Sequence, residues 1–143
     1  TPKAPFAQPA VDSFLLLSPS PPKRISPAKA FGSLEKPILC MTGTRDTSPL
    51  RPEVTPQSRL EVYRALPAGK KFQLNLKDAP HRAFSDNPRR GETHHPRYHP
   101  AVLALSTAFW KATLEEDPTA LEWLQSEKPR EFLLPEDTWE WKK

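Results

Sequence analysis

Glycine and cysteine are scarce in this sequence, and it contains no long apolar run. The 143 residues include four glycines and a single cysteine, Cys40. One cysteine cannot form a disulfide within the chain, and no apolar run approaches the ~20 residues that a membrane-spanning helix needs. We therefore expect neither a disulfide-stapled fold nor a membrane span. Because Cys40 lies within the apolar run 38–41, we expect a buried and unreactive thiol.

A strong excess of one charge is also absent. The 21 lysines and arginines and the 17 aspartates and glutamates give a net charge of +4. A nucleic-acid-binding surface would show a basic stripe with aromatic residues interleaved. The densest cationic stretch runs from Arg82 through Arg89 and Arg90 to Arg97, and prolines and histidines interrupt it. We therefore expect an ordinary solvated surface and no nucleic-acid partner.

Proline is abundant, and it divides the chain into short apolar segments. There are 19 prolines, and hydrophobic residues make up 36% of the chain. Residues 11–18 and 37–43 are short, nearly continuous apolar runs, a pattern typical of strands buried on both faces of a parallel sheet. Residues 71–76 alternate apolar and polar side chains, which indicates a third strand near a sheet edge, with one face more solvated.

A helix is predicted between the second and third strands. Thr55 is suited to its N-cap and Pro56 to its first helical position. Leu60, Tyr63 and Leu66 then recur at helical spacing and form one apolar stripe. Further helices are predicted from residue 100 and, more briefly, from residue 117.

The order of these elements predicts the fold class. Strands that alternate with helices favour parallel pairing through right-handed crossovers. We therefore expect an α/β fold with about three mostly parallel strands and flanking helices. Residues 1–10 are predicted to form a linker or loop, and residues 126–143 a tail that packs back on the surface.

Two side chains that can share a proton follow neighbouring strands. Asp46 lies three residues after the strand that ends at Gly43, and His81 lies five residues after the strand that ends at Leu76. Because the carboxyl ends of parallel strands meet at one edge of a sheet, the loops that carry Asp46 and His81 can be adjacent, so that the carboxylate can accept a hydrogen bond from the imidazole. A carboxylate in that position fixes the tautomer of the imidazole and stabilises the imidazolium.

The two segments that carry these residues resemble parts of one known family. Residues 37–46 (P-I-L-C-M-T-G-T-R-D) resemble the penultimate strand and acid loop of α/β-hydrolases, and residues 72–81 (F-Q-L-N-L-K-D-A-P-H) resemble their last strand and histidine loop. Residues 106–111 look like the closing helix of the bacterial branch of dienelactone-hydrolase-like and chlorophyllase-like esterases. The resemblance, over roughly residues 11–125, implies a triad in the chain order Ser, Asp, His, with Asp46 as the acid, His81 as the base and no cofactor.

The sequence departs from that family at the nucleophile. The family carries its serine in a G-x-S-x-G turn, and none of the four glycines is four residues from another. Ser18 and Ser20 end the first strand in a proline cluster, unlike such a turn. The resemblance therefore implies that residues 1–143 are the C-terminal portion of one hydrolase domain, with the serine upstream of Thr1. The expected partners are the N-terminal half of that domain and an ester substrate.

The resemblance implies that the function is hydrolysis of carboxylic esters. The chain by itself is expected to be inactive. Its first strand is expected to have an unpaired edge. The alternative is a non-catalytic binding or scaffold module that keeps the hydrolase topology. At the level of residues, Asp46 could instead cap backbone amides in a turn, and His81 could bond a nearby carbonyl. Asp78 and Asp86 flank His81, and either could replace Asp46 as its partner.

Three more histidines raise the question of a metal site. His95 and His99 have the i, i+4 spacing that suits a metal on a helix, and His94 precedes them. Pro96 and Pro100 argue against a regular helix there, and no cysteine or well-spaced carboxylate completes four ligands. No metal site is therefore predicted.

The four tryptophans divide into two pairs. Trp110 and Trp123 lie in predicted helices, where packing against the core explains them. Trp139 and Trp141 are two residues apart in the charged tail, and the sequence assigns them no role.

Overall fold

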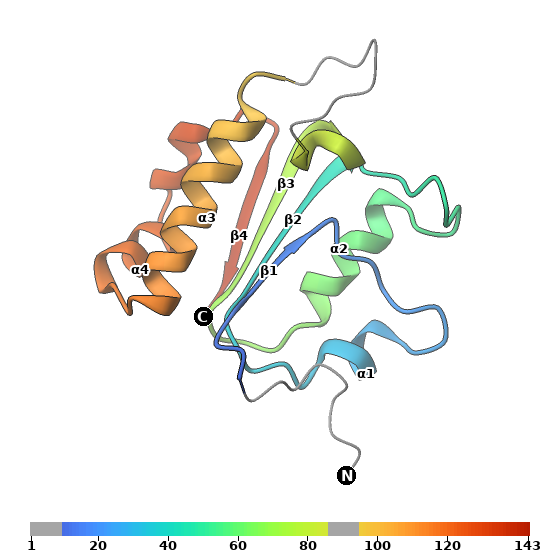
Figure 1. Ribbon diagram of the computed structural model, residues 1–143, viewed down its shortest axis with the longest axis horizontal. Coiled ribbons are helices and arrows are strands. Elements are labelled where there is room, and N and C mark those ends of the chain that lie inside the picture. Colours follow the sequence, from blue (N-terminus) through green and yellow to red (C-terminus); the bar gives the residue numbers. More distant parts are fainter. Residues whose placement is uncertain (1–9, 86–94) are drawn as a thin grey trace.

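The protein folds around a single sheet with four strands in the order β1-β2-β3-β4. The computed structural model describes residues 10–85 and 95–143. β1 (Phe14–Leu17), β2 (Ile38–Arg45) and β3 (Lys71–Pro80) run parallel, whereas β4 (Thr138–Lys142) pairs antiparallel with β3 (Figure 1). The α/β class is therefore confirmed, with a mixed four-stranded sheet in place of about three mostly parallel strands.

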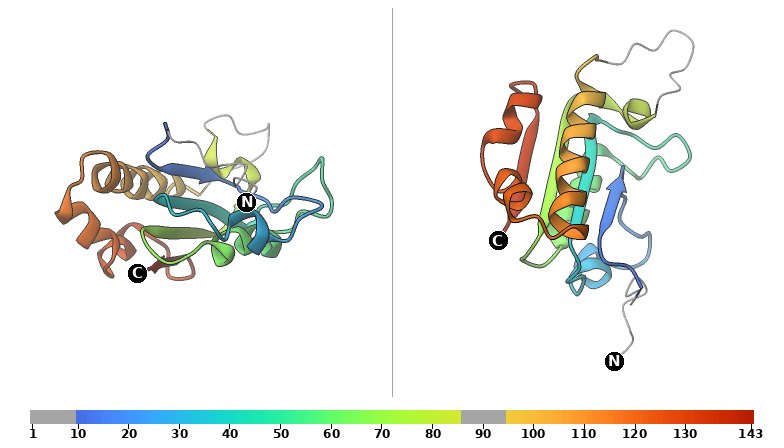
Figure 2. Two further views of the ribbon diagram at one scale, coloured as in Figure 1. Left: turned by 90° about the horizontal axis from the view of Figure 1, so that it is seen from below. Right: turned by 60° about the vertical axis from the view of Figure 1, so that its left-hand side comes forward.

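Helices cover both faces of this sheet. α1 (Pro27–Phe31) and α2 (Pro56–Ala65) lie on one face, and α3 (Tyr98–Leu114) lies on the other with α4 (Pro118–Leu124) beside it (Figure 2). Two short 3-10 helices, η1 (His81–Phe84) and η2 (Lys128–Phe132), complete the fold. Among the described residues, no helix has the length and apolar character to cross a membrane.

The start of α2 is fixed by the residues that the sequence indicates. Thr55 Oγ1 accepts a hydrogen bond from the Ser58 amide at 3.1 Å, and Ser58 Oγ accepts one from the Thr55 amide at 3.0 Å. This reciprocal capping, with Pro56 at the first position, confirms the predicted N-terminus. The predicted apolar stripe is wrong by one residue at its start, because Arg59 is buried and Leu60 is only partly buried.

β2 separates two cores. Leu39 and Met41 pack in the cluster that includes α3, and Ile38 and Cys40 pack in the cluster that includes α1 and α2. This alternation follows from the pleat of a strand, which turns successive side chains to opposite faces. Burial of β2 on both faces and of Cys40 is therefore confirmed.

β1 differs from the prediction of a strand buried on both faces. Its first three residues are only partly buried, and Leu17 is 46% exposed. The reason is its position, since within the described ranges β1 pairs with β2 alone and its other side has no partner strand. An unpaired edge on the first strand was expected and is confirmed.

β3 lies next to the edge strand β4, in keeping with a position near the edge. The alternation of β3 predicts that one face is more solvated. This prediction is wrong, because Lys71 and Gln73 are almost completely buried. Lys71 Nζ donates a hydrogen bond to the carbonyl oxygen of Glu35 at 3.0 Å, and burial lowers the pKa of this amine. Lys71 thus has a partner for its buried amine, whereas the buried oxygens Gln73 Oε1 and Asn75 Oδ1 have none among the described residues.

The tail corrects the prediction most clearly, because residues 126–143 supply η2 and the fourth strand. Trp139 of β4 is buried, stacks on Phe72 with ring centroids 5.7 Å apart, and donates from Nε1 to the Leu124 carbonyl at 2.9 Å. Trp141 packs partly buried against the same core, as do Trp110 and Trp123. The tail therefore supplies the strand next to β3 in the sheet.

Candidate catalytic acid–base pair

The end of β2 is shaped to bring its loop against β3. The pairing of the two strands shifts register between Gly43 and Arg45. A Cβ atom on Gly43 would lie 2.2 Å from the Ala79 carbonyl oxygen, so only glycine permits this approach. The Asp46 amide then donates to the Gly43 carbonyl at 3.0 Å. This tight turn directs Asp46 toward the neighbouring strand end.

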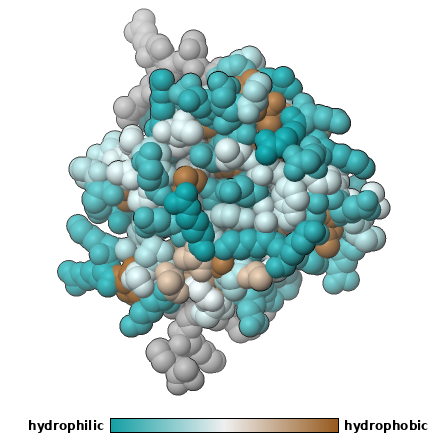
Figure 3. Space-filling view, turned by 180° about the vertical axis from the view of Figure 1, so that it is seen from behind, coloured by the Kyte–Doolittle hydropathy of each residue, from teal (hydrophilic) through white to brown (hydrophobic). Residues whose placement is uncertain are grey.

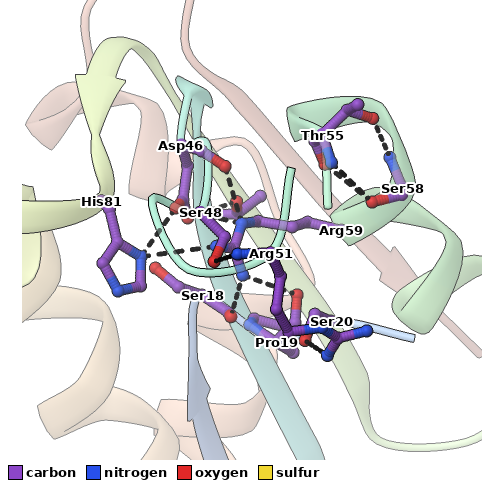
Figure 4. A network of polar contacts seen from close by, with 11 residues as sticks. Ser18, Pro19, Ser20, Asp46, Ser48, Arg51, Thr55, Ser58, Arg59 and His81 are labelled. Atoms are coloured by element: carbon purple, nitrogen blue, oxygen red, sulfur yellow. Dashed lines mark hydrogen bonds and ion pairs between the residues drawn. The ribbon is translucent and has the colours of Figure 1, made fainter. Parts of the chain in front are cut away.

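The two residues that sequence reasoning pairs do meet. β3 ends at Pro80, η1 begins at His81, and His81 Nδ1 lies 2.9 Å from Asp46 Oδ1 (Figure 4). Asp78, one of the two alternative partners, is ion-paired with Arg45 at 3.0 Å. The other alternative, Asp86, lies outside the described residues. The structure thus gives Asp46 as the carboxylate partner of His81.

Asp46 is held by side chains on both of its carboxylate oxygens. Its side chain is 0% exposed. Thr42 Oγ1 donates to Oδ2 at 2.9 Å, while Oδ1 accepts from His81 Nδ1 and is ion-paired with Arg59 Nε at 3.0 Å. A buried carboxylate without partners would be strongly destabilising, so this set of donors explains why the acid can lie out of contact with water.

Arg59 is a component of the site that sequence reasoning missed. Its side chain is 3% exposed, and Nε also donates to the Asp46 carbonyl at 2.7 Å. Nη1 donates to the carbonyl of Ser18 and, at 3.4 Å, to that of Pro19. One guanidinium therefore joins α2, the acid loop and the end of β1. The available signal was an arginine on the same helical stripe as the buried Val62 and Tyr63.

The charge of Arg59 is maintained despite its burial. Burial lowers the pKa of this guanidinium, and the adjacent Asp46 carboxylate raises it. A guanidinium is not deprotonated in proteins, so Arg59 stays a cation at neutral pH. Arg59 therefore supplies a permanent positive charge beside the buried Asp46.

The contacts of His81 assign its tautomer. The 2.9 Å contact with Asp46 is shorter than the 3.5 Å contact between His81 Nδ1 and Arg59 Nη2, so Nδ1 carries the proton and donates it to Asp46. The other nitrogen, Nε2, is then left with a lone pair that can accept a proton. Since the His81 side chain is 50% exposed, this imidazole can act as a general base toward a bound molecule.

A hollow of about 370 Å³ lies against His81. Leu17 and Ser18 at the end of β1 line it together with Arg82, Phe84 and Ser85. Ser18 has a left-handed φ of 52°, which is unfavourable for a residue with a side chain. Its Oγ is buried and has no hydrogen-bond partner among the described residues, so Ser18 is not bonded to His81.

His95 and His99 lie at the start of α3. His95 stands in the turn before α3, where its Nδ1 accepts from the Arg97 amide at 3.2 Å and its ring contacts Tyr98 at 5.6 Å between centroids. The expectation that no regular helix includes this stretch is wrong for His99 and Pro100, which lie in the first turn of α3, where a proline is tolerated. His94 lies outside the described residues. Within residues 10–85 and 95–143, no three His, Cys, Asp or Glu side chains gather as metal ligands would.

Comparisons with known proteins add no family to this description. No family model, no curated protein and no solved structure matches the chain.

Proposed function

We propose that the chain contributes the general base and the orienting acid of a serine hydrolase that acts on carboxylic esters. The observation that carries the proposal is the buried Asp46 carboxylate 2.9 Å from Nδ1 of a half-exposed His81. That arrangement leaves Nε2 as a proton acceptor on the open side of the site. The resemblance of residues 37–46 and 72–81 to α/β-hydrolases supports the same assignment.

His81 and Asp46 have distinct parts in the proposed reaction. His81 Nε2 takes the proton of a serine hydroxyl as its oxygen attacks the ester carbonyl, and the resulting imidazolium is stabilised by Asp46. The imidazolium then gives this proton to the alcohol as the carbon–oxygen bond breaks. A water molecule then attacks the acyl-serine intermediate, His81 again accepts and returns the proton, and the acid is released. These steps use no metal ion.

The nucleophilic serine is proposed to lie in sequence that precedes Thr1. The chain has no G-x-S-x-G turn, which is the form that the resemblance implies. The free edge of β1 supports this placement, because a further parallel strand added there would end on the same rim as Asp46 and His81. The hollow beside His81, lined by the end of β1, is where a serine on such a strand would meet the base.

A hydrolysis assay tests the proposal. In the protein that includes the preceding segment, His81→Ala is expected to lower kcat/KM for p-nitrophenyl acetate by a factor of ~10³ or more, because the general base is lost. His95→Ala is the matched control, since His95 is exposed and its Nδ1 accepts from the Arg97 amide, and it should leave the rate unchanged. Turnover that survives His81→Ala undiminished would remove His81 from the mechanism.

A serine-directed probe separates the enzyme from a binding module. A fluorophosphonate is expected to label the protein, and His81→Ala should abolish the labelling because the serine is no longer activated. If the protein resists labelling and hydrolyses no ester, the non-catalytic alternative holds and the proposal fails.

A further inference from the structure

Arg59 contacts the proposed base as well as the acid. His81 Nδ1 contacts two groups of opposite charge, Asp46 Oδ1 at 2.9 Å and Arg59 Nη2 at 3.5 Å (Figure 4). Asp46 Oδ1 is shared between them, because Arg59 Nε lies 3.0 Å from the same oxygen. The carboxylate that would stabilise a protonated His81 is therefore already paired with a cation.

Contacts with the backbone fix the guanidinium of Arg59 in this position. Nε donates to the Asp46 carbonyl at 2.7 Å, and Nη1 donates to the carbonyl of Ser18 and, at 3.4 Å, to that of Pro19. The planar fork of arginine suits such a set of acceptors. Because the side chain is 3% exposed, little water screens its charge. The positive charge of Arg59 therefore acts on His81 at close range.

Charged side chains on the surface differ from Arg59 in this respect. Figure 3 shows that hydrophilic residues cover most of the side of the molecule turned away in Figure 1. Arg64, one turn further along α2 than Arg59, is likewise exposed. Water and salt screen the charges of such residues. Removing the charge of Arg64 is therefore expected to have little effect on His81, which makes it a reference for Arg59.

Other ionisable groups surround His81 on the elements that pack against η1, which are β2, β3 and α3. On η1 and at the adjoining ends of these elements, they are Arg45, Lys77, Asp78, Arg82, Tyr98 and His99. Arg45 and Asp78 are ion-paired with each other at 3.0 Å, so their charges largely cancel at a distance. Asp46 and Arg59, in contrast, contact the imidazole nitrogen directly.

We propose that Arg59 is a positioning residue that holds Asp46 and opposes protonation of His81, so that the imidazole stays a neutral base at lower pH than it would beside Asp46 alone. The consequence for hydrolysis rests on the proposed function. Only a neutral imidazole can accept the proton of a nucleophile, and a nearby cation disfavours the imidazolium. Arg59 therefore extends the pH range of the reaction toward acid.

An NMR titration of the His81 ring, in the protein that includes the preceding segment, measures this effect. Arg59→Gln removes the charge and keeps an amide that can donate to Asp46. The pH at which half of the His81 rings are protonated should rise by about one unit or more in this variant. Arg59→Lys keeps the charge and should stay closer to the wild type. Arg64→Gln is the matched control, because it removes the same charge from an exposed position on α2, and it should leave the midpoint unchanged. Equal midpoints in Arg59→Gln and the wild type would overturn the inference.

A measurement on the wild-type protein decides the question if Arg59→Gln does not fold. The Nε–H resonance of Arg59 should shift with pH and show the same midpoint as the His81 ring, because the two side chains share Asp46 Oδ1. The corresponding resonance of the exposed Arg64 should show no such step. An Arg59 resonance that stays constant while His81 titrates would mean that the guanidinium does not act on the imidazole, and the inference would fail.

The pH profile of hydrolysis separates this inference from the proposed function. Per folded molecule, kcat/KM for p-nitrophenyl acetate should decrease toward acid, and in Arg59→Gln the decrease should begin at higher pH, so that the loss is about tenfold or more at acid pH and smaller at alkaline pH. A purely structural loss would lower the rate equally at every pH. A higher His81 midpoint in Arg59→Gln, in a protein that hydrolyses no ester, would retain the role of Arg59 and reject the hydrolase. Hydrolysis with the same acid limb in Arg59→Gln and the wild type would do the reverse.

Discussion

Two buried aspartates, Asp46 at the end of β2 and Asp137 just before β4, are held in different ways. Both are nearly inaccessible, with 0% and 3% exposure. Within the described residues, the carboxylate oxygens of Asp137 accept hydrogen bonds from the backbone amides of Lys77 and Leu134, both at 2.7 Å. The carboxylate oxygens of Asp46 accept hydrogen bonds from the side chains of Thr42 and His81 and are ion-paired with Arg59.

The difference in donors separates a structural carboxylate from one suited to chemistry. Backbone amides neither titrate nor move independently, so Asp137 fixes the chain before β4 against the end of β3. The donors of Asp46 include an imidazole that is half exposed and can change its protonation state. Burial of an acidic side chain therefore does not by itself indicate function; the identity of its partners does.

The tail region is expected to act on stability alone. Trp139→Ala removes a buried ring that stacks on Phe72 and bonds the Leu124 carbonyl, and it should lower the free energy of unfolding by about 4 kcal/mol. Urea denaturation measures this loss. Ester hydrolysis per folded molecule should remain at the wild-type level, and a parallel loss of turnover would assign the tail a part in the site and weaken the contrast between the two aspartates.

The protein should lose stability when the Arg59 guanidinium beside Asp46 is removed. Arg59→Met leaves the buried Asp46 without its guanidinium partner, and an unpaired buried charge costs about 3 kcal/mol or more. Arg64→Met on the exposed side of α2 is the matched control and should change the urea midpoint little. Equal midpoints for the two variants would show that Arg59 does not compensate the charge of Asp46.

Cys40 is a third buried ionisable side chain, and unlike Asp46 and Asp137 it stays neutral. Burial raises the pKa of its thiol to about 12 from an ordinary 9.0, with a smaller opposing effect of Lys142. Iodoacetamide reacts with the thiolate, so at pH 9.0 the folded protein should resist alkylation while the urea-unfolded chain reacts. Reaction of the folded protein should rise only as the pH approaches 12. Equal rates at pH 9.0 would mean that Cys40 is accessible as a thiolate.

The contact between Asp46 and His81 could be predicted because it follows from topology. Both residues come shortly after parallel strands, and neighbouring parallel strands end on the same rim. Topology made the contact possible, and the resemblance of residues 37–46 and 72–81 to α/β-hydrolases favoured it over a local cap of the turn by Asp46. Arg59 could not be found in the same way, since its role depends on which side of α2 faces the acid loop, and the apolar residues of that helix left the stripe uncertain by one position.

The fourth strand was missed for a different physical reason. Residues 138–142 alternate, with Trp139 and Trp141 on the core side, but the segment is short and otherwise charged. Its conformation is decided by pairing with β3 and by the Trp139–Phe72 stack, which are contacts with residues far away in sequence. Such pairing determines strand formation more than local preference does.

The most direct test compares Asp46→Asn with Asp137→Asn in the same two assays, ester hydrolysis per folded molecule and urea unfolding. We expect Asp46→Asn to lower hydrolysis by a factor on the order of 10³–10⁴, because asparagine no longer holds the productive tautomer of His81. Asp137→Asn should lower the unfolding midpoint and retain hydrolysis. Wild-type turnover in folded Asp46→Asn, or an equal loss in Asp137→Asn, would contradict the assignment of Asp46 and His81 as the catalytic pair.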